Sequence, residues 1–167
     1  MEDCGGDKGT AHSYLPIYEK HFRNKRSNIS LLEIGIYHGH SLKMWEEYFD
    51  NSEIIGIDIN LKQMKFPIGE LKLHECDATD SSKLQKLFNN KKFDYIIDDG
   101  SHLVQHQLKS FQILFPFLKE GGVYFIEDVD NLDHSKHLFE ELHPNIQIMD
   151  LRPEKNRYDD VLIIIEK

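Results

Sequence analysis

The sequence predicts an α/β fold in which helices cover a mostly parallel sheet, and three observations support this. Short apolar runs bounded by turn residues alternate with segments of helical periodicity, the pattern of βαβ units. The first apolar run opens into a glycine-containing loop, as in doubly wound folds. Two later runs, residues 95–97 and 123–126, end abruptly in carboxylates, as buried parallel strands do where their carboxyl ends carry the chemistry.

The composition predicts one compact domain with a hydrophobic core. The chain has 167 residues, of which 40% are apolar and 11% aromatic, and no linker or repeat divides it. We expect a single domain over residues 1–167, with a helical N-terminal lead over 1–28 and a Rossmann-like core over 29–167. The net charge of −9 argues against nucleic acid as the main partner, because binding phosphates needs a basic face, although it leaves room for a small basic patch.

Membrane and secretion signals are missing from the sequence. No window approaches the roughly 20 apolar residues that a membrane-spanning helix needs, and the N-terminus lacks the pattern of a signal peptide. Cys4 and Cys76 are far apart and form no Cys-x-x-Cys motif, so we expect neither a disulfide framework nor a structural zinc site. These features predict a cytoplasmic protein with no membrane partner.

The residue pattern of the N-terminal lead predicts one helix. Tyr14, Tyr18 and Phe22 recur at helical spacing. Pro16 is tolerated only if it lies in the first turn. Thr10 stands where an N-cap residue would precede the helix.

A glycine loop follows the first predicted strand, residues 29–34. The loop runs from Gly35 to Gly39, and the apolar face of residues 42–49 predicts the helix after it. Ser41 stands where the N-cap of that helix belongs.

The second predicted strand ends in Asp58, about 20 residues after the glycine loop, which is the layout of nucleoside binding. The acid accepts hydrogen bonds from ribose hydroxyls in this layout. A dinucleotide loop needs a second glycine beside its pyrophosphate, and Tyr37 stands in that place, so we expect S-adenosylmethionine (SAM), which carries no phosphate. Glu33, Gly35 and Gly39 form a Glu-x-Gly-x-x-x-Gly run that resembles the first motif of class I methyltransferases, with an ordinary strand-to-helix turn as the alternative.

Further strands and helices complete the pattern. The connection over residues 59–70 is polar, with Pro67 and Gly69, and has room for a helical turn; residues 152–159 form a charged loop. Asp77 stands where class I methyltransferases have an acid facing the adenine amino group, and a turn or helix-capping role fits equally well. We expect further strands at residues 54–57, 71–76, 95–97, 123–126, 146–149 and 161–165. We also expect a short helix that is capped by Ser81 or Ser82 and runs to residue 88, and a helix over 135–142.

Three carboxylates follow two neighbouring strands and predict a metal site. Asp99, Glu127 and Asp128 would meet at one edge of the sheet. Because like charges a few ångström apart raise one another's pKa, three such groups need a cation between them. A hard divalent ion, Mg²⁺ before Ca²⁺, suits oxygen ligands. His102 would lie over the same site if a helix starts at Asp99.

Each member of this group also has an alternative role. Asp98 or Asp99 could cap the following helix, and the two later acids could be polar residues that leave a strand. His102 and His106 are spaced to share a helical face and could bind zinc, but the neighbouring hard oxygens and the lack of a nearby thiolate favour Mg²⁺. Three acids together with a histidine favour the metal site over separate coincidences.

The whole pattern resembles the metal-dependent sugar O-methyltransferases of the macrocin and mycinamicin type. The resemblance covers nearly the whole chain, most strongly residues 7–58 and 93–130. The runs that carry it are Asp7-Lys8-Gly9-Thr10 with His12 and Tyr14, Leu32-Glu33-Ile34-Gly35-Ile36, Asp98-Asp99-Gly100-Ser101-His102, and Glu127-Asp128. Larger members of this group carry an additional N-terminal domain, for which this sequence shows no counterpart.

The resemblance implies a fold, a reaction and a set of site residues. It implies a Rossmann-like class I methyltransferase fold with a seven-stranded sheet in the order 3-2-1-4-5-7-6. It also implies that Asp99, Glu127 and Asp128 bind Mg²⁺ and that His102 is the base, with Asp99 as its catalytic companion. SAM would be bound by Glu33, Gly35, Gly39, Ser41, Asp58 and Asp77. The acceptor would be a sugar hydroxyl of a nucleotide sugar, a glycoside or a glycan.

Other functions stay open. Catechol-type methyltransferases share the cofactor loop, in which Ser41 would meet the methionine carboxylate, but they carry Lys at the place of His102; a phenolic acceptor is therefore the second choice. A cofactor-binding subunit without activity is another alternative, and a dehydrogenase is disfavoured by Tyr37. Because little chain extends beyond the sheet and its helices, we also hypothesise a homo-oligomer whose second subunit helps to enclose the acceptor.

Overall fold

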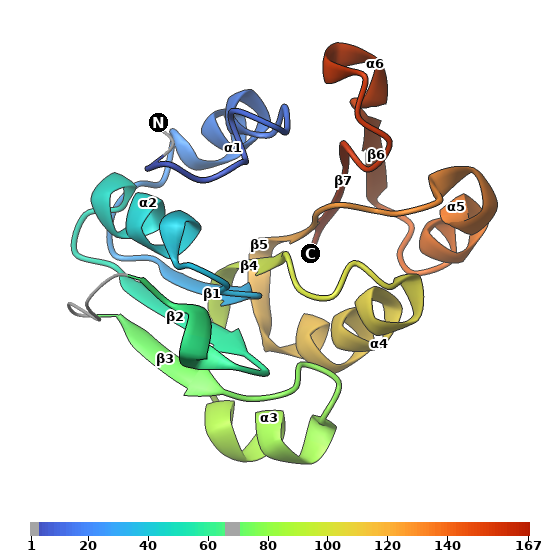
Figure 1. Ribbon diagram of the computed structural model, residues 1–167. Helices are drawn as coiled ribbons and strands as arrows, with labels where there is room; N and C mark the ends of the chain where they lie inside the picture. Colours follow the sequence, from blue (N-terminus) through green and yellow to red (C-terminus); the bar gives the residue numbers. More distant parts are fainter. Residues whose placement is uncertain (1–3, 66–70) are drawn as a thin grey trace.

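The computed structural model describes residues 4–65 and 71–167, which form a seven-stranded sheet flanked by helices (Figure 1). The strands lie in the order β3-β2-β1-β4-β5-β7-β6, as the resemblance implied. Neighbouring strands are parallel except at β7, which runs antiparallel to both β5 and β6. The strands are β1 Ser30–Ile34, β2 Glu53–Asp58, β3 Lys72–Glu75, β4 Phe93–Asp98, β5 Leu118–Ile126, β6 Ile146–Asp150 and β7 Val161–Glu166.

Helices cover both faces of the sheet, as predicted. Helices α1 and α2 pack on one face, and α3, α4 and α5 pack on the other (Figure 1). Within the described part of the chain, no helix is both long and apolar enough to cross a membrane. The helices are α1 Leu15–Phe22, α2 His40–Tyr48, α3 Ser81–Phe88, α4 Val104–Leu114, α5 Leu132–Glu140 and α6 Arg152–Lys155, with short 3₁₀ turns η1 Leu61–Gln63 and η2 Phe115–Phe117.

Strand β1 lies in the middle of the sheet and is buried along its whole length. Its side chains alternate between the two faces because a strand has a period of two residues. Leu32 and Ile34 pack in the core beneath α3 and α4, whereas Leu31 packs in the core beneath α1 and α2. Glu33 shares the face of Leu31, so a carboxylate is placed in an apolar layer. A buried charge of this kind needs a partner.

Aromatic rings hold α1 on the sheet. The ring centroid of Phe22 lies 4.5 Å from that of Tyr95 and 5.6 Å from that of Trp45, and Tyr18 lies 5.2 Å from Trp45. Burying each such ring contributes roughly 1.5–3 kcal/mol. Pro16 lies in the first turn, as predicted. This packing fixes the start of α1, and so brings the residues before it to the edge where the parallel strands end.

Two predicted N-caps are wrong. Helix α2 begins at His40 with Gly39 as its N-cap, so Ser41 lies inside the first turn. Gly39 has a φ of +83°, a conformation that glycine adopts without strain, and the helix can therefore start earlier than a serine cap would allow. Thr10 does not cap α1, because its hydroxyl donates to the carbonyl oxygen of Gly6 at 2.9 Å.

Helix α3 is also capped by another residue than predicted. Asp80 is the N-cap, and its side chain accepts a hydrogen bond from the backbone N–H of Lys83 at 3.0 Å. Ser81 and Ser82 lie inside the helix. An aspartate and a serine satisfy the same backbone donors, so sequence alone could not choose between neighbouring candidates.

Some boundaries differ from the predictions. Helix α5 begins at Leu132 rather than at residue 135, and the charged loop over residues 152–159 contains α6. The connection over residues 59–70 contains the 3₁₀ turn η1. Pro67 and Gly69 lie outside the described residues.

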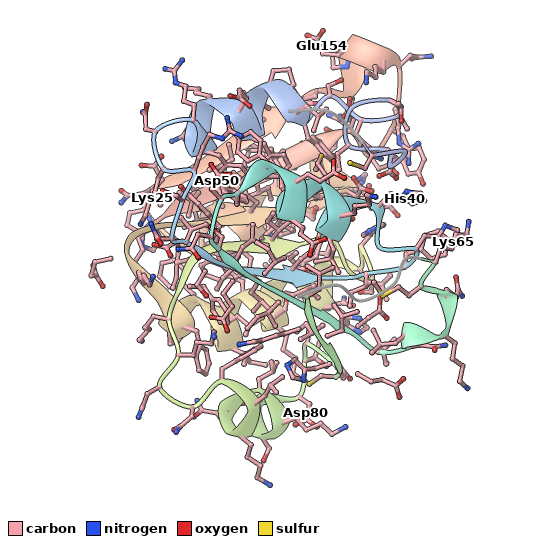
Figure 2. All side chains as sticks on the ribbon, turned by 90° about the vertical axis from the view of Figure 1, so that its left-hand side faces the viewer. Lys25, His40, Asp50, Lys65, Asp80 and Glu154 are labelled. Carbon is pink, nitrogen blue, oxygen red and sulfur yellow. The ribbon has the colours of Figure 1, made fainter. Side chains whose placement is uncertain are left out.

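The two ends of the sheet face opposite sides of the molecule. Lys25 and Asp50, which precede β1 and β2, lie at one end, and His40 and Lys65, which follow these strands, lie at the other (Figure 2). Ligands of open α/β sheets bind outside the carboxyl ends of the strands. The edge near His40 is therefore where a functional site is expected.

Candidate functional site

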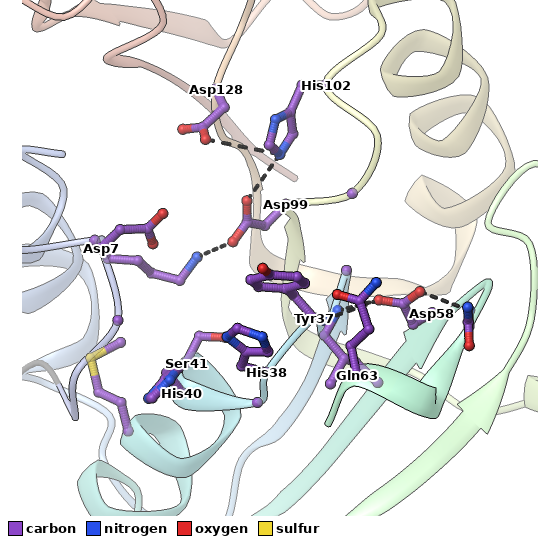
Figure 3. A pocket seen from close by; sticks show the side chains of 18 of the residues that line it. Asp7, Tyr37, His38, His40, Ser41, Asp58, Gln63, Asp99, His102 and Asp128 are labelled. Atoms are coloured by element: carbon purple, nitrogen blue, oxygen red, sulfur yellow. Dashed lines mark hydrogen bonds and ion pairs between the residues drawn. The ribbon is translucent and has the colours of Figure 1, made fainter. Parts of the chain in front are cut away.

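A cavity of about 730 Å³ opens at the carboxyl edge of the sheet (Figure 3). Its walls come from the loops after β1, β2, β4 and β5 and from the N-terminal loop. A smaller cavity of about 240 Å³ adjoins it and is lined by Asp77. Neither Glu33 nor Glu127 lines either of the two cavities. The predicted residues that line the larger cavity are Gly35, Gly39, Ser41, Asp58, Asp99, His102 and Asp128.

Asp58 holds the glycine loop in place. Its Oδ2 accepts hydrogen bonds from the backbone N–H groups of Ile36 at 2.7 Å and Tyr37 at 3.2 Å, and its Oδ1 accepts from Asn60 at 2.9 Å. Tyr37 has a φ of +45°, an uncommon conformation that these bonds help to fix. A carboxylate oxygen has more than one acceptor site, so Asp58 can also accept from a ligand hydroxyl. The acid thus shapes the loop as well as lining the cavity.

Asp77 is a turn residue and a wall of the smaller cavity at once. Its Oδ1 accepts from the backbone N–H and the hydroxyl of Thr79, each at 2.8 Å. These bonds lower the pKa of Asp77 and keep it ionised. Both interpretations of the sequence are compatible with this position, and the adenine contact stays a prediction.

Two acids and a histidine converge at one end of the larger cavity. His102 Nε2 lies 3.3 Å from Asp99 Oδ1 and 3.9 Å from Asp128 Oδ2 (Figure 3). No helix starts at Asp99, because α4 begins at Val104, and His102 precedes it with a φ of +57°. Asp128 has a φ of +53°. His106 bonds to Ser101 rather than joining His102, so the structure does not assemble the zinc pair.

The charges in this group depend on one another. The hydrogen bond to Asp99 raises the pKa of His102. Burial raises the pKa of Asp128 to about 7, and the charge of Asp99 adds to this effect. Burial also opposes ionisation of Asp99, but the charge of Lys8 and the bond from His102 outweigh it and lower the pKa. The group therefore favours a positive charge beside its carboxylates.

Glu127 does not line the cavity but contacts Lys8, which does. The Lys8 Nζ atom lies 2.7 and 2.8 Å from the two oxygens of Glu127 and 2.5 Å from Asp99 Oδ2. Tyr18 donates to Glu127 Oε1 at 2.5 Å. The sequence did not predict Lys8 or Tyr18 as part of the site. The signal that could have found Lys8 is the need of three buried acids for a cation, combined with a lysine in a run that resembles the family.

The N-terminal lead also contacts Asp128. Tyr14 Oη donates to Asp128 Oδ1 at 2.7 Å, and His12 Nδ1 lies 3.2 Å from the same oxygen. The two rings are stacked, with centroids 4.8 Å apart. Ser13 binds Asp160 through its backbone N–H and its hydroxyl. Residues far apart in the sequence thus build one acidic site.

Among the described residues, one group of potential metal ligands consists of His12, Asp128 and Asp159. Asp159, however, accepts from Arg157 through both oxygens, at 2.6 and 3.2 Å. Tyr14 already donates to Asp128 on this side. Both carboxylates of this group therefore already have donors within the protein, whereas the two buried ring nitrogens of His12 make no hydrogen bond within the described residues.

The other group, Asp99, His102 and Asp128, fits a divalent cation better. Its ligand atoms lie within 4.8 Å of one another, and hard carboxylate oxygens suit Mg²⁺. Asp99 and Asp128 reach the cavity, whereas the third predicted ligand, Glu127, is engaged by Lys8. The donors that face the cavity therefore fit the ion, and Glu127 can join them only if Lys8 moves.

Residues 25–162 match the protein family described as a methyltransferase domain. This chain belongs to that family. The match runs from before β1 into β7 and includes all the acids of the site.

Curated relatives are similar in sequence to this chain over most of its length. Mycinamicin VI 2''-O-methyltransferase of Micromonospora griseorubida is 36% identical over 132 residues, covering 72% of this chain and 32% of the relative. Demethylmacrocin O-methyltransferase of Streptomyces fradiae is 37% identical over 132 residues, covering 72% of this chain and 33% of the relative. The resemblance seen in the sequence is confirmed, and the chain spans about a third of the length of these relatives.

Solved structures share the fold. The MycE methyltransferase from the mycinamycin biosynthetic pathway, in complex with Mg and SAH, superimposes with a TM-score of 0.75 at 26% identity, covering 96% of this chain and 51% of that chain. A SAM-dependent methyltransferase from Archaeoglobus fulgidus gives a TM-score of 0.68 at 19% identity and covers 98% of this chain and 96% of that one. The Rossmann-like class I fold is confirmed.

Proposed function

We propose that this chain is the catalytic part of a metal-dependent O-methyltransferase that transfers the methyl group of SAM to a sugar hydroxyl. The observation that carries the proposal is the convergence of Asp99, His102 and Asp128 at the cavity that Asp58 and the glycine loop help to form. The complex of MycE with Mg and SAH supports the choice of both cofactors.

The two adjoining cavities would hold SAM, which supplies an electrophilic methyl group on sulfur. Gly35, Gly39 and Ser41 border the larger cavity, and Asp58 and Asp77 offer carboxylates to the ribose and the adenine. Glu33 would act on the cofactor site indirectly, because its carboxylate is buried outside the cavity lining, 3.6 Å from Lys8 Nζ. The residues therefore position the methyl group, which is the main requirement of this reaction.

Asp99 and Asp128 would bind Mg²⁺ at the end of the cavity, and Glu127 would complete the ligands. Mg²⁺ supplies a Lewis acid there that lowers the pKa of the acceptor hydroxyl. His102 would accept the hydroxyl proton, because its ring lies beside the two carboxylates at the proposed metal site. Asp99 is a catalytic companion of His102, since its bond to Nε2 orients the ring.

The acceptor is the finer part of the proposal. MycE has also been solved with Mg, SAH and mycinamycin VI, and a relative from Streptomyces olivaceus is named for methylation of a rhamnosyl tetracenomycin. These names support a sugar of a glycoside as the acceptor here, before a nucleotide sugar or a glycan. The net charge of −9 supports a small carbohydrate partner rather than nucleic acid.

Residues 1–167 are proposed to act as one domain, in which the lead over 1–28 completes the core over 29–167. The contacts of Lys8 and Tyr14 with the acids after β4 and β5 support this. A homo-oligomer is proposed as well, because Tyr37 and Leu103 near the site are 63% and 56% exposed. A monomeric mass in light scattering at micromolar concentration would count against the oligomer.

Methyl transfer from SAM with a labelled methyl group tests the function. The panel contains macrolide glycosides, simple glycosides, nucleotide sugars and a catechol, each with Mg²⁺ or with a chelator. We expect transfer to a glycoside that requires Mg²⁺ and falls about 10²–10⁴-fold in His102→Gln. His137→Gln, which changes an exposed histidine of α5, is the matched control and keeps full activity. Transfer to the catechol alone, or transfer unaffected by the chelator, would contradict the proposal.

A further inference from the structure

Lys8 places a positive charge in the middle of the acids. Its side chain is only 3% exposed. Nζ contacts Asp99 and both oxygens of Glu127 at 2.5–2.8 Å, and lies 3.6 Å from Glu33 Oε1. Three carboxylates from β1, the end of β4 and the end of β5 therefore share one ammonium group.

This ammonium stays charged in spite of its burial. Oxygens of Asp99 and Glu127 lie within 2.8 Å of Nζ and an oxygen of Glu33 lies 3.6 Å away, so three carboxylates compensate the buried positive charge. Removing Lys8 would leave the buried carboxylates without a compensating positive charge, which is strongly unfavourable. Lys8 acts as a cation supplied by the protein itself.

The Nζ atom of Lys8 occupies the space that a divalent ion bonded to Asp99 and Glu127 would fill. Magnesium bonds to oxygen at about 2.0–2.1 Å, and Nζ already lies within 2.8 Å of oxygens of both Asp99 and Glu127. An ion bonded to both residues would need the same space. Two cations a few ångström apart in a buried site also repel each other strongly.

We infer that Lys8 is a tethered counter-cation that competes with the divalent metal for Asp99 and Glu127, and so sets the metal affinity of the site. This inference rests on the metal site of the proposed function. When the metal binds both carboxylates, the ammonium shifts toward Glu33, whose carboxylate is buried and already 3.6 Å away. Glu33 thereby gives the displaced charge a partner inside the protein.

Binding of Mn²⁺ to the chelator-treated protein tests this without any activity assay. Free Mn²⁺ is measured by electron paramagnetic resonance during titration of the parent chain, Lys8→Met and Lys8→Gln. We expect each variant to bind Mn²⁺ at least tenfold more tightly than the parent, which corresponds to about 1.4 kcal/mol. Lys8→Gln keeps hydrogen-bond donors toward the carboxylates and serves if Lys8→Met does not fold, as judged by circular dichroism.

Lys119→Met is the matched control. Lys119 binds the buried carboxylate of Asp94 at 2.7 Å, so the same substitution removes a lysine–carboxylate ion pair away from the site. Its Mn²⁺ affinity should equal that of the parent. A second titration with Asp99→Asn in the Lys8→Gln background should abolish the gain.

The outcomes separate this inference from the proposed function. Equal or weaker Mn²⁺ binding in both folded Lys8 variants, with binding in the parent, overturns the inference and leaves the metal site intact. A loss of SAM affinity with unchanged Mn²⁺ affinity also overturns it, because Lys8 would then serve the cofactor. No Mn²⁺ binding in any folded protein overturns the metal-dependent function and the inference together.

Discussion

The backbone of Asp99 lies directly against Gly35, where an added Cβ would be 1.9 Å from the Asp99 carbonyl oxygen. Gly35 also has a φ of +87°, which favours glycine. The backbone N–H of Asp99 donates to the carbonyl oxygen of Ile34 at 2.9 Å. The cofactor loop and the first proposed metal ligand are therefore held together by backbone contact, and a side chain at position 35 has no room.

Gly35→Ala should disturb both parts of the site. The added methyl group must displace the backbone of Asp99, so we expect loss of SAM binding and loss of Mn²⁺ binding in calorimetric titrations. Gly121→Ala is the matched control, because Gly121 also has a positive φ, of +73°, but no atom lies within 4 Å of an added Cβ. It should lower the free energy of unfolding by about 1–2 kcal/mol through backbone strain alone. Equal effects of the two substitutions on ligand binding would refute the contact argument.

Asp58→Asn should weaken SAM binding by about tenfold or more, since the amide replaces one acceptor oxygen with a donor. The remaining side-chain oxygen can then accept hydrogen bonds from the N–H groups of Ile36 and Tyr37 or from the ribose, but the other set of bonds is lost. Calorimetric titration of SAM measures the change. Asp80→Asn makes the same chemical change at the N-cap of α3, where asparagine caps equally well, and should leave the affinity unaltered. Unchanged affinity in Asp58→Asn would remove Asp58 from the cofactor site.

The ion pairs of Asp94 should make part of the free energy of unfolding depend on pH. Burial opposes ionisation of Asp94, but hydrogen bonds from Lys119, Lys25 and the backbone N–H of Ser30 outweigh this and lower its pKa. A depressed folded-state pKa contributes stability above the unfolded value near ~3.9, and this is lost as the pH falls through the lower folded value. Asp94→Asn should therefore lower the free energy of unfolding by about 2 kcal/mol at pH 7.

Urea unfolding of the parent and Asp94→Asn from pH 7 down to pH 3 measures this. The difference between the two proteins should be constant near neutral pH and shrink in the acidic range. Asp133→Asn, which changes an exposed aspartate paired with Arg152, should have a much smaller effect. A difference that grows toward acidic pH would contradict the assignment.

Patterns that repeat over many residues made the fold predictable. The buried runs that became β1, β4 and β7 are mostly apolar, and their length and spacing indicate a parallel α/β sheet. Helix starts were harder, because adjacent residues such as Asp80 and Ser81 are equally good caps. At Gly39 the left-handed conformation decided the start of α2, and periodicity carries no information about it.

The site was predictable only where its residues follow strand ends. Asp99 and Asp128 come together because β4 and β5 are parallel neighbours. The positive φ of His102 leaves no signal in hydrophobic periodicity, and the inward position of Lys8 depends on contacts with Asp99 and Glu127, which are far from it in the sequence. A lysine in a surface loop and a lysine buried among acids look alike in one sequence, since the difference lies in the tertiary partners. The separation of Glu127 from the cavity was unpredictable for the same reason.

Calorimetric titration of SAM into the folded chain, with and without Mg²⁺, tests the central claim most directly, and Asp99→Ala is its companion. Asp99 lies at the metal end of the cavity, whereas Asp58 and Asp77 border the proposed ribose and adenine positions. We predict that the parent and Asp99→Ala both bind SAM, with one site per chain, and that only the parent binds Mg²⁺. A folded protein that binds no SAM under either condition would contradict the assignment of this cavity to a methyltransferase.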